Sequence, residues 1–268
     1  MLYVVKIGGG SGIEPTAVAR DIVDPIAHGD QVVVVHGCSH ATDQLADALH
    51  RPTRYVTSTA GVRSRYTDAP ALEIFSMAAR RINGAIVQEL QRLGLNALGL
   101  TGLDGGLLRG PRKDILRIVE SDGRQRIIRD DYTGRVERVN AELLRLLLAH
   151  GYIPIIAPLA LADSGDAVNV DGDRAAAMVA ASLAADALII LTNVPGLLAD
   201  ATDERSLVTS LARTRISDYE VQMSGGMRRK LMGAREALQA GVPRVVLADG
   251  RVAHPMQSAL AGQGTVIA

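Results

Sequence analysis

The chain has 268 residues, of which 47% are apolar and 22% charged, and its formal net charge at pH 7 is zero. This composition is typical of a globular protein with a hydrophobic core, built as one large domain or two smaller ones. With 3% aromatic residues, no tryptophan and no net charge, the chain lacks the stacking platforms and the basic field of nucleic-acid-binding proteins, and its apolar runs are too short to span a membrane. The single cysteine, Cys38, excludes a disulfide within the chain, and no signal peptide precedes the first apolar run, so we expect a cytoplasmic protein.

Strand-like and helix-like segments alternate along the chain. Short runs rich in β-forming residues and bounded by turn residues are predicted to be strands: Leu2–Ile7, Gln31–His36, Asn96–Leu100, Tyr152–Ala157, Ala187–Thr192, Pro243–Ala248 and Gly264–Ala268. Stretches between them carry apolar residues at helical spacing, namely Glu14–His28, Ala71–Leu93, Ala141–His150, Asp173–Ala185 and Met227–Ala240. This alternation predicts an α/β fold with a mostly parallel sheet.

One segment departs from this alternation. Ile115–Asp130 consists of two polar-apolar runs around an Asp-Gly turn, which predicts a β-hairpin that projects from the sheet edge. We expect two lobes, an N-terminal one over residues 1–166 and a C-terminal one over residues 167–268, with Ser164–Asp166 at their join.

Glycine-rich loops follow several predicted strands, at the sheet edge where α/β proteins bind ligands. The first loop, Gly8–Gly12, could hold an anion on its backbone N–H groups. It is not a P-loop, because the chain contains no Gly-Lys dipeptide, and its glycine spacing does not match the dinucleotide fingerprint. A phosphate site here must therefore be organised in another way.

Lysine is rare in this chain. Three of the 29 Lys and Arg residues are lysines, Lys6, Lys113 and Lys230, so these positions are candidates for a compact ammonium group rather than a planar guanidinium. Lys6 lies within an apolar strand, where a lysine is costly unless it meets an anion; the alternative is an edge strand from which it reaches solvent. Lys230 follows SGGM at the start of a predicted helix, which also attracts anions, or else it lies on a solvated helix face.

Two carboxylates, Asp171 and Asp173, mark the junction between a loop and a helix in NVDGDRAA (Asn169–Ala176). Either one could cap the helix N-terminus. Either one could instead hold a lysine or a metal ion, and the spacing alone does not assign these roles.

Six motifs carry a family resemblance, and they occur in the family's order: VVKIGGG, VVVHGCS, SRYTD (Ser64–Asp68), NVDGD, TNVPGLL (Thr192–Leu198) and GGMRRK (Gly225–Lys230). On these motifs, which cover essentially the whole chain, the protein resembles the amino acid kinase family and, within it, the acetylglutamate kinase branch. The resemblance implies a three-layer α/β/α sandwich with a central, mostly parallel sheet and without a P-loop. It also implies phosphoryl transfer from ATP to a side-chain carboxylate.

By the family pattern, Lys6 stabilises charge on the transferring phosphoryl group, Lys230 neutralises the ATP phosphates, and Asp173 orients both lysines. Such a transition state needs positioned positive charge more than a catalytic base. The resemblance further implies Mg²⁺ held through the phosphates, with no metal site built from protein side chains. The nucleotide side would comprise Gly8, Gly9, Gly10, Thr192, Asn193, Gly196, Leu197, Gly225, Gly226 and Met227.

The family pattern also implies an acyl-substrate side, formed by Gly37, Cys38, Arg65 and Asn169. Arg65 matches the arginine that grips the substrate's α-carboxylate, a task suited to a planar guanidinium. Asn169 matches the residue that holds the substrate's amide and carboxylate. We interpret Cys38 as a small filler rather than a reactive thiol, and the neighbouring His36 as structural.

The second glycine loop departs from acetylglutamate kinases, because HGCSHATD (His36–Asp43) replaces their HGGG-proline pattern. Gly102–Leu108, Arg109–Asp114 and Arg129–Asn140 instead resemble kinases that act on 2-aminoadipate or glutamate attached to a small acidic amino-group carrier protein, in lysine and sometimes arginine biosynthesis. We therefore expect carrier-bound aminoadipate as the substrate. Two alternatives stay open: a kinase for free N-acetylglutamate, and a non-catalytic sensor of the same fold.

Basic residues gather in two segments of the neutral chain. Residues 51–81 hold six arginines and two acidic residues, and residues 107–138 hold eight arginines and Lys113 against six acidic residues. This surplus could steer an acidic carrier to the surface, with Arg112 and Lys113 as contacts, or it could only cover solvated faces. The resemblance also implies a homodimer, and because no extra helix precedes the first strand we expect neither hexamers nor feedback by arginine.

Overall fold

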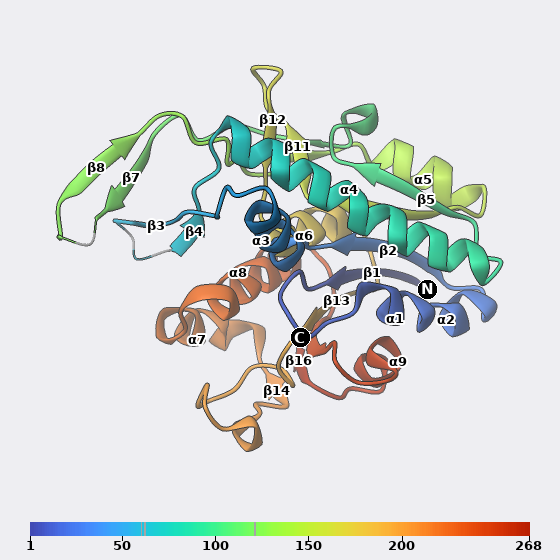
Figure 1. The fold of residues 1–268 in the computed structure, drawn as a ribbon. Coiled ribbons are helices and arrows are strands. Elements are labelled where there is room, and N and C mark those ends of the chain that lie inside the picture. The colour runs from blue at the N-terminus through green and yellow to red at the C-terminus, as the bar shows by residue number, and fades with distance from the viewer. Residues whose placement is uncertain (60, 62, 121) are drawn as a thin grey trace.

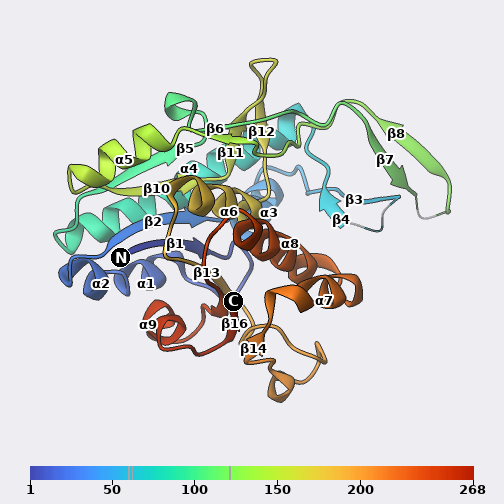
Figure 2. The same ribbon diagram turned by 180° about the vertical axis from the view of Figure 1, so that it is seen from behind.

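A central eight-stranded sheet runs through the protein (Figures 1 and 2), for which a computed structural model describes residues 1–59, 61, 63–120 and 122–268. In spatial order its strands are β14 (Ser210–Leu211), β16 (Thr265–Ile267), β15 (Val245–Asp249), β13 (Ala187–Thr192), β1 (Leu2–Ile7), β2 (Gln31–His36), β10 (Ile153–Ala157) and β5 (Ala97–Thr101). All neighbouring pairs are parallel except β15 and β16. The mostly parallel sheet is confirmed.

Helices pack on both faces of this sheet, because its inner strands are apolar on both sides. One face is covered by α1 (Pro15–Arg20), α2 (Val23–Ala27), α4 (Ala69–Arg92) and α9 (Pro255–Leu260), and the other by α5 (Ala141–Ala149), α6 (Gly172–Leu183) and α8 (Gly225–Gln239). On β1, Val5 packs with the first group of helices and Val4 with the second. This confirms the three-layer α/β/α sandwich. Within the described ranges, no helix is long and apolar enough to cross a membrane.

The remaining helical elements include two departures from the predicted ones. Glu14–His28 forms α1 and α2 rather than one helix, because Pro25 has no N–H and its ring would clash with the carbonyl of residue 21 in a continuous helix. Residues 39–48 fold as α3 (Ser39–Ala48), which the apolar spacing does not predict. The other helical elements are α7 (Ile216–Gln222) and the 3₁₀ turns Asp104–Gly106, Glu204–Ser206 and Arg213–Arg215.

Two smaller sheets accompany the central one among the described residues. The first has the order β4 (Arg63–Arg65), β3 (Tyr55–Ser58), β7 (Leu116–Val119), β8 (Gln125–Ile128) and reaches away from the body of the protein (Figure 1). The second has the order β12 (Ala167–Asn169), β11 (Leu159–Leu161), β6 (Leu108–Arg109), β9 (Arg138–Val139). Strands β7 and β8 form a hairpin within the predicted segment, but β7 pairs with β3 instead of extending the central sheet.

The expected join between two lobes lies in a tight turn. Residues 164–166 connect the antiparallel strands β11 and β12, and the N–H of Ala162 donates to the carbonyl of Asp166 at 2.8 Å. The central sheet crosses this position, since β1 from the first part of the chain pairs with β13 from the second. The division into lobes at residue 166 stays a prediction.

The carboxyl ends of β1 and β2 bring two glycine loops into backbone contact. A Cβ atom at Gly9 would lie 2.4 Å from the backbone nitrogen of Cys38, and one at Gly37 would lie 2.6 Å from the nitrogen of Gly9. Only glycine permits this approach at both positions. The contact fixes the end of β1, which carries Lys6, against the start of α3.

Candidate active site

The carboxylate of Asp173 contacts two lysines: Lys6, which precedes one glycine loop, and Lys230, which follows another. Lys6 Nζ lies 2.7 Å from Asp173 Oδ1, and Lys230 Nζ lies 3.2 Å from Asp173 Oδ2. The three residues come from β1, the start of α6 and the second turn of α8. The Lys6 and Asp173 side chains are each 6% exposed and that of Lys230 is 13% exposed. Lys6 is thus buried in the middle of the sheet and does not reach solvent from an edge strand.

The charges of this cluster do not balance, since two ammonium groups share one carboxylate. Burial alone would raise the pKa of Asp173, but Lys230 and Lys6 outweigh it and hold that pKa well below its usual range. Burial also lowers the pKa of Lys230, and the charge of Asp173 opposes this shift. A buried surplus of positive charge is unfavourable until an anion neutralises it, so the cluster is suited to bind one.

The neighbouring carboxylate, Asp171, has a different task. Its Oδ1 accepts hydrogen bonds from the N–H groups of Asp173 at 3.0 Å and Arg174 at 3.1 Å, so it is the N-cap of α6. Its Oδ2 lies 3.2 Å from Nε of Arg229. The structure therefore divides the two roles that the sequence leaves open: Asp171 caps the helix and Asp173 holds the lysines.

In the described part of the chain, no three His, Cys, Asp or Glu side chains gather where they could hold a metal ion.

The predicted phosphate-binding glycines lie close in sequence to the two lysines. Gly8 to Gly10 follow Lys6, and Gly225 and Gly226 begin α8 one turn before Lys230. Gly10, Gly225 and Gly226 are exposed, and a Cβ atom at any of them would meet nothing within 4 Å. An anion can therefore approach their backbone, whereas a Cβ atom at Gly8 would lie 2.9 Å from the carbonyl oxygen of Leu191.

The other predicted nucleotide residues differ in how accessible they are. Asn193 is exposed just after β13, while Thr192 is 4% exposed and Met227 is half-buried. Leu197 is fully buried in the core, and its N–H donates to Thr265 Oγ1 at 2.8 Å. A Cβ atom at Gly196 would lie 2.7 Å from the same hydroxyl, so the turn after β13 packs against β16. In this arrangement the Leu197 side chain belongs to the core.

Cys38 and His36 are both structural in their surroundings. Cys38 is 3% exposed, and burial raises the pKa of its thiol to about 11, so the thiolate needed for reactivity is absent at neutral pH. Burial lowers the pKa of His36 to about 4. The neutral ring lies 3.2 Å from Asn83 Nδ2 and 3.3 Å from the carbonyl oxygen of Gly37, which fixes the second glycine loop.

Arg65 is 9% exposed, and its terminal N–H groups are already engaged. One terminal nitrogen donates to Asp43 Oδ1 at 2.8 Å and to Thr53 Oγ1 at 2.6 Å. The other donates to the carbonyl of Ser39 at 3.1 Å and to the Tyr55 hydroxyl at 3.4 Å. A substrate carboxylate would therefore have to take over donors that Asp43 and the other acceptors now occupy.

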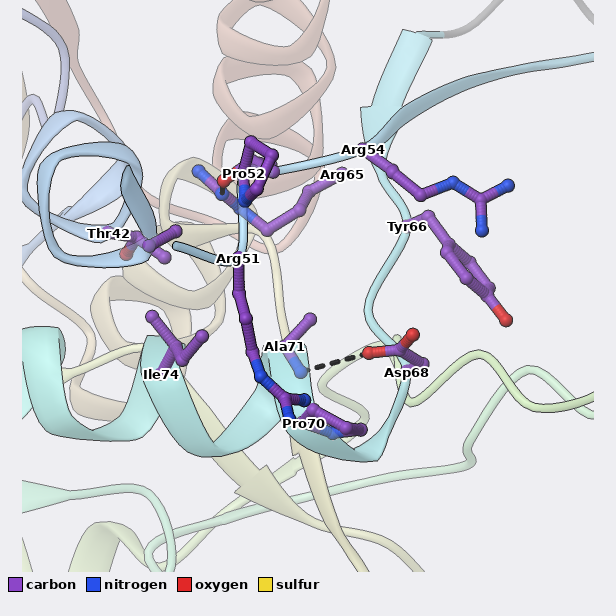
Figure 3. Close-up of a pocket in the computed structure, with 12 residues that line it drawn as sticks. Thr42, Arg51, Pro52, Arg54, Arg65, Tyr66, Asp68, Pro70, Ala71 and Ile74 are labelled. Atoms are coloured by element: carbon purple, nitrogen blue, oxygen red, sulfur yellow. Dashed lines mark hydrogen bonds between the residues drawn. The ribbon is translucent and has the colours of Figure 1, made fainter. Parts of the chain in front are cut away.

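A cavity of about 180 Å³ lies beside Arg65, between α3, α4 and the segment that leads into β3. Figure 3 shows Arg51 stretched toward Pro70 at the start of α4, where Asp68 accepts a hydrogen bond from the N–H of Ala71 at 2.9 Å. Arg54 points away from Arg51, and its side chain lies alongside that of Tyr66 (Figure 3). The lining does not include the lysine cluster, so this basic cavity is separate from the charge cluster around Asp173.

Asn169 lies beside the segment that carries Arg65. Its Nδ2 donates to Thr67 Oγ1 at 3.2 Å, and the N–H of Thr67 donates to Asp131 Oδ2 at 3.1 Å. Asp131 is fully buried and also accepts the N–H of Thr133 at 2.8 Å. The structure therefore links Asn169 to the segment that carries Arg65 through Thr67, whose hydroxyl also donates to the carbonyl of Arg65 at 3.4 Å. Asp131, for which the sequence predicts no role, holds Thr67 in place.

The two predicted carrier contacts have different surroundings. The guanidinium of Arg112 lies 3.6 Å from the ring centroid of Tyr132, donates to the carbonyl of Asp131 at 3.0 Å and lies 3.5 Å from Asp166. These contacts hold Arg112 within the protein. Of the pair, only Lys113 is exposed.

Comparisons with known proteins agree over nearly the whole chain. The model of the amino acid kinase family matches residues 1–249. LysW-aminoadipate kinase from Thermus thermophilus is 47% identical, covering 99% of this chain and 100% of that protein, and the one from Deinococcus radiodurans is 46% identical, covering 99% and 91%. LysW-aminoadipate/LysW-glutamate kinase from Saccharolobus solfataricus is 35% identical, covering 100% and 99%. The solved structure of carbamate kinase from Giardia lamblia bound to AMP-PNP shares the fold, with a TM-score of 0.70 and 19% identity over 99% of this chain and 98% of that one.

Replacing Asp173 by asparagine should destabilise the protein, because two buried ammonium groups then lack their counter-ion. We expect the free energy of unfolding at pH 7, measured by urea titration, to fall by about 3 kcal/mol. Asp218→Asn, which removes a 52%-exposed carboxylate paired with Arg215, is the control and should change it by less than about 0.5 kcal/mol.

The stability lost on replacing Asp173 by asparagine should depend on pH, in a direction set by the pKa of Asp173. The pKa of Asp173 is lower in the folded than in the unfolded state, so its stabilisation is complete above the unfolded-state value of about 3.9 and disappears as the pH falls toward the folded-state value. The stability difference between the native protein and Asp173→Asn should therefore be constant from pH 6 to 8 and shrink below about pH 4. If Asp173→Asn and Asp218→Asn lower the free energy of unfolding by the same amount, the ion pair that Asp173 shares between the two lysines is contradicted.

Proposed function

The chain belongs to the amino acid kinase family, and on this premise we propose that it transfers a phosphoryl group from ATP to the side-chain carboxylate of 2-aminoadipate attached to a small carrier protein. The two relatives at 46–47% identity, which it matches over nearly their full lengths, are both named LysW-aminoadipate kinase. The observation that carries the proposal is the contact of Lys6 and Lys230 with one buried aspartate. The reaction belongs to lysine biosynthesis, and the product is an acyl phosphate.

The lysine cluster supplies what this reaction needs. An oxygen of the acceptor carboxylate attacks the γ-phosphorus, the bond to the bridging oxygen breaks, and ADP leaves with the bonding electron pair. The acceptor is already ionised at neutral pH, so no general base is required. Charge spreads over the transferring group in the transition state, and fixed cations stabilise it in a site from which water is largely excluded. Lys6 and Lys230 are the cations that we assign to this task.

Asp173 acts in this proposal as a positioning residue. Two ammonium groups that converge on one phosphoryl group repel each other before substrate binds, and the shared carboxylate offsets this repulsion. Its two oxygens each hold one lysine, which keeps both side chains in place for the anion. The N-cap hydrogen bonds from Asp171 fix the helix turn from which Asp173 projects.

We assign ATP to the C-terminal lobe, residues 167–268, and the acyl group to the N-terminal lobe, residues 1–166. The accessible backbone at Gly10, Gly225 and Gly226 fits a run of phosphates beside the lysines. Mg²⁺ would be held mainly by those phosphates, as is usual for this ion at kinase sites. The exposed Asn193 is the side chain after β13 that is best placed to contact the nucleotide.

The acyl group would lie toward Arg65 and Asn169, beside the second glycine loop at Gly37 and Cys38. The hydrogen-bonded link from Asn169 to Thr67 supports placing Asn169 and Arg65 in one subsite. For Arg65 to grip the α-carboxylate, that carboxylate must replace Asp43 on the guanidinium, an exchange of one anionic acceptor for another.

The named substrates of the relatives include acceptors of two chain lengths. The relative from Saccharolobus solfataricus is named for both aminoadipate and glutamate, so carrier-bound glutamate, and with it arginine biosynthesis, is the first alternative. One methylene group is worth only about 1–3 kcal/mol in discrimination. Free N-acetylglutamate is the second alternative. A non-catalytic sensor is disfavoured by the intact contacts among Lys6, Lys230 and Asp173.

The carrier is expected to dock near the strands that reach away from the body. Lys113 lies just before β7 with its side chain exposed, and we propose it as a contact for an acidic carrier, whereas Arg112 supports the same segment from inside. We also propose a cytoplasmic homodimer. Light scattering of the purified protein tests that assembly.

A direct comparison of acceptors tests the proposed reaction. With ATP and Mg²⁺, the purified protein should phosphorylate carrier-bound aminoadipate with a kcat/KM at least about 100-fold above that for free N-acetylglutamate, since the free acid lacks all contacts with the carrier. Lys6→Ala should abolish turnover of every acceptor, which ties the activity to this site. Equal kcat/KM for the free acid and the carrier adduct would refute carrier-bound aminoadipate as the substrate, and full activity of Lys6→Ala would refute the mechanism.

Reversing the charge of Lys113 tests the carrier contact separately. Lys113→Glu should raise the KM for the carrier adduct several-fold at low salt and leave the KM for ATP unchanged, because a rim charge mainly affects encounter. The difference should decrease as the salt concentration rises. Lys113→Gln is expected to show a smaller effect in the same direction. If the KM for the adduct is unchanged in both variants, Lys113 is not part of the docking surface.

A further inference from the structure

Arg229, the residue before Lys230, joins the starts of α6 and α8. Its Nε lies 3.2 Å from Asp171 Oδ2, while Oδ1 of the same carboxylate caps the turn that carries Asp173. The next residue, Lys230, contacts Asp173 itself. Two neighbouring ion pairs thus join the start of α6 to the second turn of α8: Asp173 with Lys230, and Asp171 with Arg229.

Arg229 also reaches a third element. Its Nη1 donates to the backbone carbonyl of Arg63, on β4, at 3.0 Å. Arg63 lies two residues before Arg65 and stacks its guanidinium over Tyr55 of β3 at 4.5 Å from the ring centroid. The hydrogen bond therefore ends on the strand pair β3 and β4, in which β4 carries Arg65 and Tyr55 of β3 accepts a hydrogen bond from the Arg65 guanidinium at 3.4 Å.

An arginine is well suited to make both contacts at once. A guanidinium presents donors in a rigid planar fork, so one side can pair with a carboxylate while the other donates to a carbonyl. A lysine carries its three donors on one nitrogen, so it lacks the two separate nitrogens with which Arg229 contacts Asp171 and the carbonyl of Arg63. Arg229 is also one of many arginines in a chain with three lysines, so its identity carries no signal in the sequence.

We infer that Arg229 is a positioning residue that couples the phosphate side of the site to the acyl-acceptor side. Through Asp171 it fixes the helix turn that holds Asp173 and, with it, the two lysines. Through the carbonyl of Arg63 it holds β4, and therefore Arg65, at a set position relative to α8. This inference rests on the proposed function, since it assigns the two sides to ATP and to the acceptor. It predicts that nucleotide bound at α8 stabilises the β3–β4 pair.

The chain contains a closely matched control for this role. Arg174 on α6 pairs with Glu236 on α8, with its Nε 2.9 Å from one carboxylate oxygen and a terminal nitrogen 2.7 Å from the other. The Arg174 and Arg229 side chains are both 36% exposed. Both ion pairs join the same two helices, but among the described residues the side-chain hydrogen bonds and ion pairs of Arg174 go to Glu236 and not to β4. A residue that only ties α6 to α8 should therefore behave alike at both positions.

Steady-state kinetics of Arg229→Lys and Arg174→Lys separate positioning from general stability. For Arg229→Lys we expect the KM for the carrier adduct to rise about tenfold and kcat to fall, with the KM for ATP within about twofold of the native value, because Arg65 loses its set position. Arg174→Lys should leave all three constants within about twofold. If both variants lower the melting temperature equally and leave the kinetic constants unchanged, the coupling role is wrong.

Hydrogen exchange with AMP-PNP provides a readout that does not require turnover. In the native protein and in Arg174→Lys, AMP-PNP should slow exchange of the β3 and β4 amides, and in Arg229→Lys and Arg229→Gln this protection should be lost although the nucleotide still binds. Binding of AMP-PNP without any protection of β3 and β4 in the native protein would overturn the inference and leave the proposed function intact. Failure of AMP-PNP to bind the native protein would overturn both.

Discussion

A single buried carboxylate shared by two ammonium groups is the constraint around which this site is organised. Placing Lys6 in a central strand is unfavourable unless its charge is met, and Asp173 meets it from the first turn of α6. Lys230 approaches the other oxygen of the same carboxylate, so the cluster keeps one positive charge in excess. An anion completes it. In the proposed function, this excess positive charge binds the phosphoryl group that is transferred.

The fold brings these groups together by simple means. Parallel strands place the ends of β1, β2 and β13 at one edge of the sheet, and glycines at positions 9 and 37 let two loops touch through their backbones. The start of α6 then lies over β1, and α8 packs along α6, so that Asp173 and Lys230 meet Lys6. Arg229 links the same arrangement to β4, the strand that carries Arg65.

Much of this could be predicted from local patterns, and the exceptions have physical causes. Apolar runs and helical spacing predict the central strands and most helices, and the scarcity of lysine points to Lys6 and Lys230. Spacing could not separate Asp171 from Asp173, because both suit a helix N-terminus and only the packing of α8 decides which one meets the lysines. Nor could it show that Arg65 is already held by Asp43, since that pair is formed by tertiary packing of α3 against β4. The same holds for the hairpin β7–β8, which pairs with β3 instead of the central sheet.

The central claim is that both lysines bind the phosphoryl group during transfer, and a structure of the transition-state complex tests it most directly. We would determine a crystal structure with ADP, Mg²⁺, aluminium fluoride and the aminoadipate carrier adduct. The account predicts the Nζ atoms of Lys6 and Lys230 within hydrogen-bond distance of the fluoride group, with Asp173 still contacting both. A fluoride group contacted by one lysine alone, with the other turned away from Asp173, would contradict it.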